Sequence, residues 1–343
     1  MESSFSSKRN HVPYICSEEE NNSSKTQNKY REIISTLPRD NGGYTTTGSK
    51  LFDNLCCYQG FWYHSNSLEG VMLAQEHFKA QPSDILVCSA PKSGTTWLKA
   101  LTFAIVTRTH FNDSSNPLVT TLPHECLPSL DQKLHNRNPE FPLLATHTPY
   151  TSLPKSITSE LGCKIVYMCR DPKDAFVSTW HFARKLPIYG QEPISLEAAF
   201  ELFCKGVSFF GPYWDHVLGY WKASLEWPER VMFIKYEDMM RDTVLYVKRL
   251  AEFMGYPFSS EEEREGAVEK IIELCSFENL SNLEVNKNGM RPPRSLVAEN
   301  NAFFRKGKVG DWQNHLTTEM AERLNQITDQ MLGRSGLRFD VSS

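Results

Sequence analysis

The sequence predicts an α/β fold: a single domain in which a central parallel sheet is flanked by helices. Short apolar runs alternate with segments of helical periodicity, which is typical of parallel strands joined by helices. These runs lie at residues 85–87, 143–145, 164–169 and 231–234. The chain has 343 residues, 40% hydrophobic and 12% aromatic, so it can fill a large core. No internal repeat divides it, and we expect one domain over residues 28–343.

Residues 1–27 differ from this pattern because they are rich in Ser, Asn, Glu and Lys and have few apolar positions. Burial of so few apolar groups cannot offset the entropy lost when a segment becomes ordered. We therefore expect a disordered N-terminal tail.

The composition also limits the partners of the protein. The net charge is −4, so no overall basic field favours nucleic acid or an anionic membrane surface. Nine scattered cysteines without a Cys-x-x-Cys pair favour free thiols in a reducing compartment. The first ten residues lack the apolar segment of a signal peptide, and no run approaches the ~18 apolar residues of a membrane span. We expect a cytoplasmic protein without nucleic-acid or membrane partners.

The first predicted strand runs into the sequence Pro-Lys-Ser-Gly-Thr-Thr-Trp at residues 91–97, and a helical pattern follows. The backbone N–H groups of such a loop and of the helix N-terminus converge on one point and can bind an anion. Ser89 stands where the nucleotide-binding P-loop has its first glycine, and Lys92 precedes Gly94 instead of following it. We therefore expect a P-loop-like phosphate site that is not built for the triphosphate of ATP.

The later strands also end in polar residues, and ligands gather at the carboxyl ends of parallel strands. The run 143–145 leads to His147, and the run 164–169 leads to Arg170 and a helix that carries Ser178. A basic, glycine-punctuated segment at 305–307 offers further anion contacts. Each of these features alone is also compatible with a purely structural role, such as a local ion pair or a solvated loop.

ATP needs one continuous phosphate site and a metal ion. The residues Glu237 and Asp238, after the last predicted strand, could serve as magnesium ligands in an NTPase. Lys235 lies next to them, and its charge would compete with a metal ion. We expect no metal.

From about residue 58 to the C-terminus, these motifs closely resemble, in order and spacing, those of the cytosolic sulfotransferase family. The segments 58–62 and 274–280 look like the plant branch of that family. The resemblance implies a P-loop-like sulfotransferase fold. It also implies transfer of a sulfo group from 3′-phosphoadenosine 5′-phosphosulfate (PAPS) to a hydroxyl of a small acceptor.

The resemblance further implies site residues. PAPS would be bound through its 5′-phosphosulfate, its 3′-phosphate and its adenine by Lys92, Ser93, Gly94, Thr95, Thr96, Trp97, Arg170, Ser178, Tyr236, Phe277, Arg305, Lys306 and Gly307. His147 would be the general base, and Lys92 would also stabilise the charge of the leaving group. Because histidine titrates near ~6.5, activity is expected to fall as the pH drops through that region.

Two departures from animal members and the choice of acceptor complete the expectations. Ala145 stands where many animal members have lysine. The dimer motif of the animal members is only partly present, so we expect a monomer or weak homodimer. Flavonols or related phenolics are the expected acceptors. Brassinosteroids, hydroxyjasmonate and desulfoglucosinolates remain alternatives within the branch, and a non-catalytic PAPS-binding or PAP-binding protein is an alternative of another class.

Overall fold

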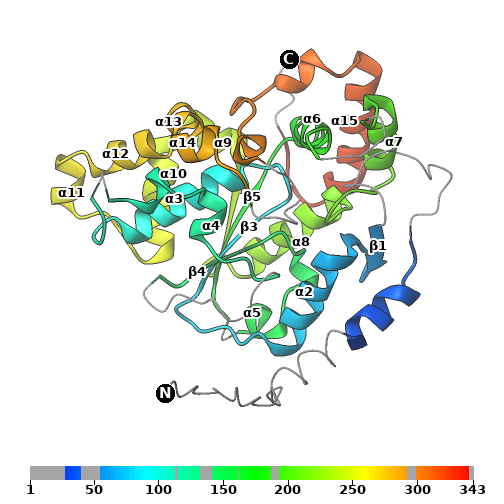
Figure 1. Ribbon diagram of the computed structural model, residues 1–343, viewed down its shortest axis with the longest axis horizontal. Coiled ribbons are helices and arrows are strands. Elements are labelled where there is room, and N and C mark those ends of the chain that lie inside the picture. Colours follow the sequence, from blue (N-terminus) through cyan, green and yellow to red (C-terminus); the bar gives the residue numbers. More distant parts are fainter. Residues whose placement is uncertain are drawn as a thin grey trace, which may run out of the picture.

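A four-stranded parallel sheet forms the centre of the computed structural model, with the strand order β4, β3, β5, β6 (Figure 1). The strands are β3 (Ile85–Ser89), β4 (Leu143–Thr146), β5 (Lys164–Cys169) and β6 (Val231–Lys235). The structure describes residues 28–39, 55–112, 115–131, 141–160, 162–186, 193–291 and 299–339. The tail predicted for residues 1–27 therefore lies outside the described residues.

Alternate residues of β3 pack into different hydrophobic clusters because successive side chains of a strand point to opposite faces. Ile85 and Val87 belong to one cluster, and Leu86 and Cys88 belong to the other. Every residue of β3 is buried. This burial on both faces explains why the strand appears in the sequence as an unbroken apolar run, and it confirms the predicted α/β sheet.

Helices cover both faces of the sheet. On the face of Ile85 lie α3 (Thr95–Thr107), α10 (Thr243–Met254) and α12 (Ala267–Leu274). On the face of Leu86 lie α6 (Pro172–Ala183), α7 (Leu196–Cys204), α8 (Tyr213–Glu226) and α15 (Thr318–Leu332). Figure 1 shows these two groups on opposite sides of the sheet. Proline at the first position of α6, with an Asp171 side chain that accepts from Lys173 N–H, fixes the start of that helix.

The other helices complete the layers and the rim. They are residues 28–36, α2 (Ser65–His77), α4 (Pro123–Cys126), α5 (Lys155–Thr158), α9 (Tyr236–Arg241), α11 (Ser260–Arg264), α13 (Phe277–Asn282) and α14 (Glu284–Lys287), with the 3₁₀ helices η1 (Pro117–Val119), η2 (Tyr150–Ser152), η3 (Asn300–Phe303) and η4 (Asp311–Asn314). Within the described ranges, no helix combines the length and the apolar character needed to cross a membrane.

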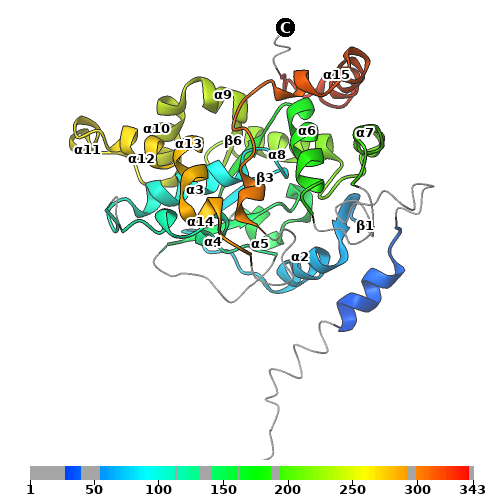
Figure 2. The same ribbon diagram turned by 45° about the horizontal axis from the view of Figure 1, so that its top comes forward.

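An antiparallel hairpin of β1 (Leu55–Tyr58) and β2 (Phe61–His64) was not predicted from the sequence. Its two-residue turn has positive φ at both Gln59 and Gly60, 51° and 84°, which matches the twist of paired strands. The hairpin packs with α2 and with the helix at 28–36 in a separate apolar cluster (Figure 2). The aromatic residues that precede α2 therefore belong to a small sheet.

Candidate active site

A cavity of about 1180 Å³ lies where the parallel strands end. Of the residues predicted for the site, all except Ser93 line it: Lys92, Gly94, Thr95, Thr96, Trp97, His147, Arg170, Ser178, Tyr236, Phe277, Arg305, Lys306 and Gly307. Ser93 is buried inside its loop. Residues that lie more than 200 positions apart in the sequence are thus brought into one cavity.

The loop between β3 and α3 has the backbone of an anion-binding site. Gly94 adopts φ of 99°, and a Cβ at this position would lie 2.7 Å from both Met168 Sδ and Tyr236 Cδ2, so only glycine fits. Lys92 also has positive φ, 66°, which strains a residue with a side chain and is most often found at functional sites. The Lys92 side chain lines the cavity.

The electrostatics of Lys92 favour a bound anion. Burial, followed by the charges of Arg305, Lys185 and Arg170, lowers the pKa of Lys92 to about 7. Its ammonium lies 4.2 Å from the centre of the Phe182 ring. A buried cation among other cations is destabilised, and an anionic ligand would relieve that repulsion.

Two arginines of this region each have an N–H group that no described residue accepts. Arg170 Nη2 donates to Asp174 Oδ2 at 3.1 Å and to the Lys308 carbonyl at 2.6 Å, while Arg305 Nη1 donates to Asp311 Oδ2 at 2.5 Å. The Nε atoms of both arginines are buried without a partner among the described residues. Since buried donors are normally paired, these groups fit a ligand rich in acceptor oxygens, such as a phosphate.

Aromatic side chains form a separate part of the cavity. The rings of Trp97 and Tyr236 are 5.7 Å apart at an interplanar angle of 72°. Phe277, 38% exposed, contacts the basic loop so closely that a Cβ on Gly307 would lie 2.6 Å from its ring. These rings offer apolar faces to a flat heterocycle beside the basic loop.

His147 is held in the tautomer that a general base requires. Its Nδ1 lies 2.8 Å from the carbonyl oxygen of Ser89. Because a carbonyl only accepts, Nδ1 carries the proton, and the lone pair of Nε2 is not engaged by any of the described residues. His216 Nε2 donates to the His147 carbonyl at 2.8 Å, and Tyr167 donates to His216 Nδ1 at 3.0 Å. This chain of bonds fixes the backbone of His147.

The predicted titration of His147 near pH 6.5 is wrong for this structure. Burial lowers the pKa of His147 to about 4, and the charges of Lys99 and Lys92 act in the same direction, although the hydrogen bond with Ser89 opposes them. The imidazole is therefore neutral throughout the physiological range. The sequence could not predict this shift because it depends on how deeply the ring is buried.

The carboxylates considered as magnesium ligands make other contacts. Glu237 Oε1 accepts from the backbone N–H of Asp171 at 2.8 Å, and Asp238 pairs with Lys235 at 3.4 Å and with Arg241 at 2.8 Å. Neither Glu237 nor Asp238 is among the described residues that line the cavity. The magnesium interpretation therefore gains no support from their geometry.

Part of the cavity wall was missed by sequence reasoning. It contains Lys99, His124, Ser129, Asp131 and Arg291. The sequence contained one signal, and it concerned Lys99. This residue is four positions after Thr95 and therefore lies on the same face of α3 as that predicted site residue. The other residues come from loops and from α4, and no local pattern assigns them to the cavity.

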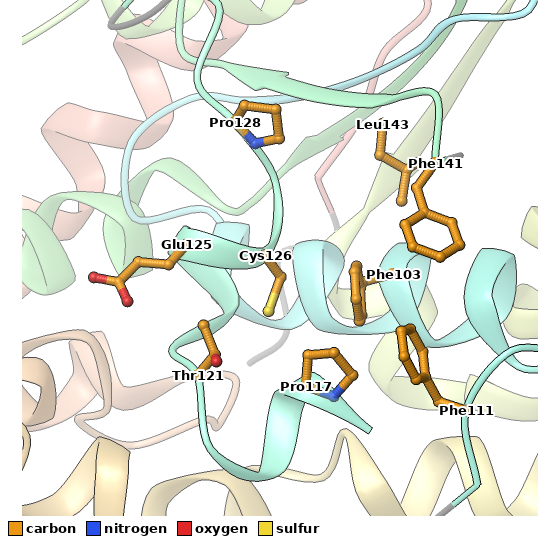
Figure 3. Close-up of a pocket in the computed structure, with 9 residues that line it drawn as sticks. All are labelled: Phe103, Phe111, Pro117, Thr121, Glu125, Cys126, Pro128, Phe141 and Leu143. Atoms are coloured by element: carbon orange, nitrogen blue, oxygen red, sulfur yellow. The ribbon is translucent and has the colours of Figure 1, made fainter. Parts of the chain in front are cut away.

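A second, smaller cavity of about 280 Å³ lies beside α3 and α4. Figure 3 shows the rings of Phe103, Phe111 and Phe141 clustered there, with Glu125 pointing away from them. None of the residues predicted for the site lines this cavity.

The chain is similar to known plant enzymes. It is 51% identical to the flavonol 4′-sulfotransferase of Flaveria chlorifolia over 89% of this chain and 95% of that protein. It is 50% identical to the flavonol 3-sulfotransferase of Flaveria bidentis, over 89% and 98% of the two chains. Cytosolic sulfotransferase 16 of Arabidopsis thaliana is 48% identical over 91% of this chain and 93% of its own length.

Solved structures have the same fold. A putative steroid sulphotransferase of Arabidopsis thaliana superposes with a TM-score of 0.69 at 34% identity, covering 96% of this chain and 100% of its own. A mouse sulfotransferase complexed with PAP superposes with a TM-score of 0.65 at 27% identity, covering 82% of this chain and 96% of its own. Residues 82–336 match the family described as sulfotransferase domain. The chain therefore belongs to the sulfotransferase family, as the resemblance predicted.

Proposed function

We propose that this protein transfers the sulfo group of PAPS to a hydroxyl of a small plant phenolic, and that its acceptor is a flavonol. The observation that carries the proposal is the shared cavity, which both His147, with its proton held on Nδ1, and Lys92 line. Sequence identities of 51% and 50% to two flavonol sulfotransferases support a flavonol as the acceptor. The relatives named cytosolic support a cytoplasmic location.

The donor is proposed to bind through three groups of residues. The loop at 91–97 holds the 5′-phosphosulfate with backbone N–H groups and the hydroxyls of Thr95 and Thr96. Arg170, Ser178 and the segment 305–307 hold the 3′-phosphate. The Nε atoms of Arg170 and Arg305 are buried and have no partner in the part of the chain that the structure describes, which supports this assignment.

The adenine is proposed to lie among the rings of Trp97, Tyr236 and Phe277, of which Phe277 packs against Gly307. Binding of a donor with charge at both ends also accounts for the cations of the cavity. An anion beside Lys92 raises the pKa of that group from about 7, so that its ammonium is fully charged when the donor is present.

The reaction follows from the positions of His147 and Lys92. His147 Nε2 takes the proton of the acceptor hydroxyl as the hydroxyl oxygen attacks sulfur. The bond between sulfur and the bridging oxygen of the 5′-phosphate breaks, and Lys92 stabilises the negative charge that develops on that oxygen. PAP, the nucleotide without its sulfo group, is the other product, and His147 returns its proton to solvent.

Aromatic residues near His147 suit a flat acceptor. The rings of His147 and Phe210 are 5.6 Å apart, and Phe209, Phe182 and Phe303 also line the cavity. Stacking on such rings favours polycyclic phenols. Brassinosteroids, hydroxyjasmonate and desulfoglucosinolates are the alternative acceptors, and the steroid relative, at 34% identity, is less similar than the flavonol enzymes.

The test is to incubate the purified protein with PAPS and a panel of flavonols, a brassinosteroid, hydroxyjasmonate and a desulfoglucosinolate. Mass spectrometry is expected to show the gain of one sulfo group on a flavonol. A protein that binds PAP but sulfates no member of the panel or of a plant metabolite extract would instead be a non-catalytic nucleotide-binding protein. We also propose that the protein is a monomer or a weak homodimer. Static light scattering of the purified chain measures its molar mass and checks this proposal.

A further inference from the structure

Asp174 is a buried carboxylate that the proposed reaction does not use. It lies in the first turn of α6 and is 1% exposed. It is not the N-cap of that helix, because the Asp171 side chain fills that position by accepting from Lys173 N–H. Since a buried carboxylate is costly unless N–H or O–H groups surround it, the groups that bind Asp174 indicate what it does.

The N–H groups that bind Asp174 come from two distant parts of the chain. Arg170, at the end of β5, donates from Nη2 to Asp174 Oδ2 at 3.1 Å. The backbone N–H groups of Gly310 and Trp312 donate to Oδ2 and Oδ1 at 2.8 and 3.0 Å. Arg170 Nη2 also donates to the carbonyl of Lys308 at 2.6 Å. One carboxylate therefore joins the end of β5 to a segment that lies 136 to 138 positions later in the sequence.

The two backbone bonds to Asp174 flank Asp311, whose side chain contacts the basic loop at 305–307. Asp311 is 5% exposed. Its Oδ2 accepts from Arg305 Nη1 at 2.5 Å, and its Oδ1 lies 3.5 Å from Lys306 Nζ. The bonds to Asp174 therefore fix the backbone of the residue that orients these two basic side chains.

Asp174 acts from behind the cavity. It is not among the described residues that line the cavity, whereas Arg170 and Arg305 are. After the bonds to the two aspartates, each arginine still has a buried Nε without a partner in the described part of the chain. The carboxylates thus hold the two guanidinium groups in place and leave part of each available to a ligand.

We propose that Asp174 is a positioning residue, which holds Arg170 and the basic loop at the spacing that a single 3′-phosphate requires. It contacts neither the nucleotide nor the reacting atoms. It therefore affects the preference for a nucleotide with a 3′-phosphate, and the KM for PAPS, but not the chemical step at His147. This inference rests on the proposed function for the identity of the nucleotide.

The test measures, by calorimetry, the affinity of the purified protein for PAP and for 5′-AMP, which differ only by the 3′-phosphate. Asp174→Asn keeps the shape of the side chain, but its NH₂ group replaces one acceptor oxygen and faces an N–H group. PAP binding is expected to weaken about ten- to a hundredfold, and 5′-AMP binding should change less than about threefold. If the protein transfers sulfo groups, KM for PAPS should rise by the same factor as the Kd of PAP, with kcat within about threefold.

The matched control is Asp84→Asn. Asp84 is also 1% exposed and accepts from the backbone N–H of Gln81 at 2.7 Å, but it precedes β3 at the end of the strand away from the loop at 91–97. This variant should keep the wild-type preference for PAP. Urea unfolding of both variants shows how far each substitution lowers stability, and a purely structural role would reduce affinity for the two nucleotides equally.

A second variant tests Asp174 if Asp174→Asn is poorly folded. Asp174→Glu keeps the charge and both acceptor oxygens, and it is expected to keep more of the preference for PAP than Asp174→Asn does. In a protein that already carries Arg305→Ala, the effect of Asp174→Asn on PAP affinity should be smaller, because one of the groups through which Asp174 acts is gone.

Two results would overturn the positioning role: equal losses of affinity for PAP and 5′-AMP, or a PAP affinity that neither Asp174 variant changes. Both results are obtained from binding alone, so they do not depend on finding an acceptor that is sulfated. A wild type that binds PAP no more tightly than 5′-AMP would overturn the proposed nucleotide as well.

Discussion

The two ends of the cavity are built differently. At the donor end, the residues proposed to bind the nucleotide come in short motifs, each placed by a strand end or a tight loop, as in the segment 91–97. At the end proposed for the acceptor, Lys99, His124 and Asp131 line the cavity from a helix face, a four-residue helix and a loop. The donor end therefore depends on local backbone geometry, whereas the acceptor end depends on how distant segments pack. Changes at the donor end should affect nucleotide binding, and changes at the acceptor end should affect selectivity.

The largest effect is expected where the two ends meet. His147→Ala removes the proposed base, and kcat should fall by about 10²–10⁴-fold because proton transfer is lost. Affinity for PAP, measured by calorimetry, should stay within about threefold, since His147 is not among the proposed nucleotide contacts. His77→Ala, an exposed histidine at the end of α2, is the control. An unchanged kcat in His147→Ala would remove His147 as the base.

The backbone of the donor end can be tested at Gly94. Gly94→Ala introduces a Cβ 2.7 Å from Met168 Sδ and Tyr236 Cδ2 at φ of 99°, so both a clash and backbone strain of about 1–3 kcal/mol are expected. The control is Gly336→Ala, which has φ of 79° but no atom within 4 Å of the added Cβ. Urea unfolding and PAP titration should show a larger loss of stability, and a loss of nucleotide affinity, only for Gly94→Ala. Equal losses would mean that the clash has no effect.

A more moderate effect is expected at the 3′-phosphate contacts. Arg305→Ala should weaken PAP binding about ten- to a hundredfold, because it removes charge-assisted hydrogen bonds. The affinity for 5′-AMP, which lacks the 3′-phosphate, should change little. Arg184→Ala, an exposed arginine at the end of α6, is the control. Affinity that magnesium restores would support the ATP-binding alternative instead.

The pH profile is expected to show the smallest change on its acidic side. Since the pKa of His147 is about 4, the base stays unprotonated down to pH 5, and kcat should be nearly constant between pH 7 and pH 5. On the alkaline side, Lys92 of the free protein loses its proton as the pH rises through its pKa of about 7. Consequently kcat/KM for PAPS should decline above pH 7. A steep loss of kcat near pH 6.5 would contradict the burial of His147.

The sequence was sufficient for the sheet and for the short motifs that the fold brings to one cavity, because both are encoded locally. Apolar runs gave the four parallel strands, and the residues that follow each strand lie at one edge. The hairpin with its turn at Gln59 and Gly60 was not predicted, because the aromatic residues on both sides of this two-residue turn drew attention away from a possible strand pair. The acceptor wall and the pKa of His147 could not be predicted, since both arise from packing between segments that are distant in the sequence.

The central claim, sulfo transfer at His147, is tested most directly by following a radiolabelled sulfo group of PAPS in the presence of a flavonol. The account predicts that the wild type moves the label to the flavonol with one PAP released for each product, and that His147→Ala does so about 10²–10⁴-fold more slowly. Label that appears as inorganic sulfate, or label that stays on PAPS with every acceptor of the panel, would contradict the account.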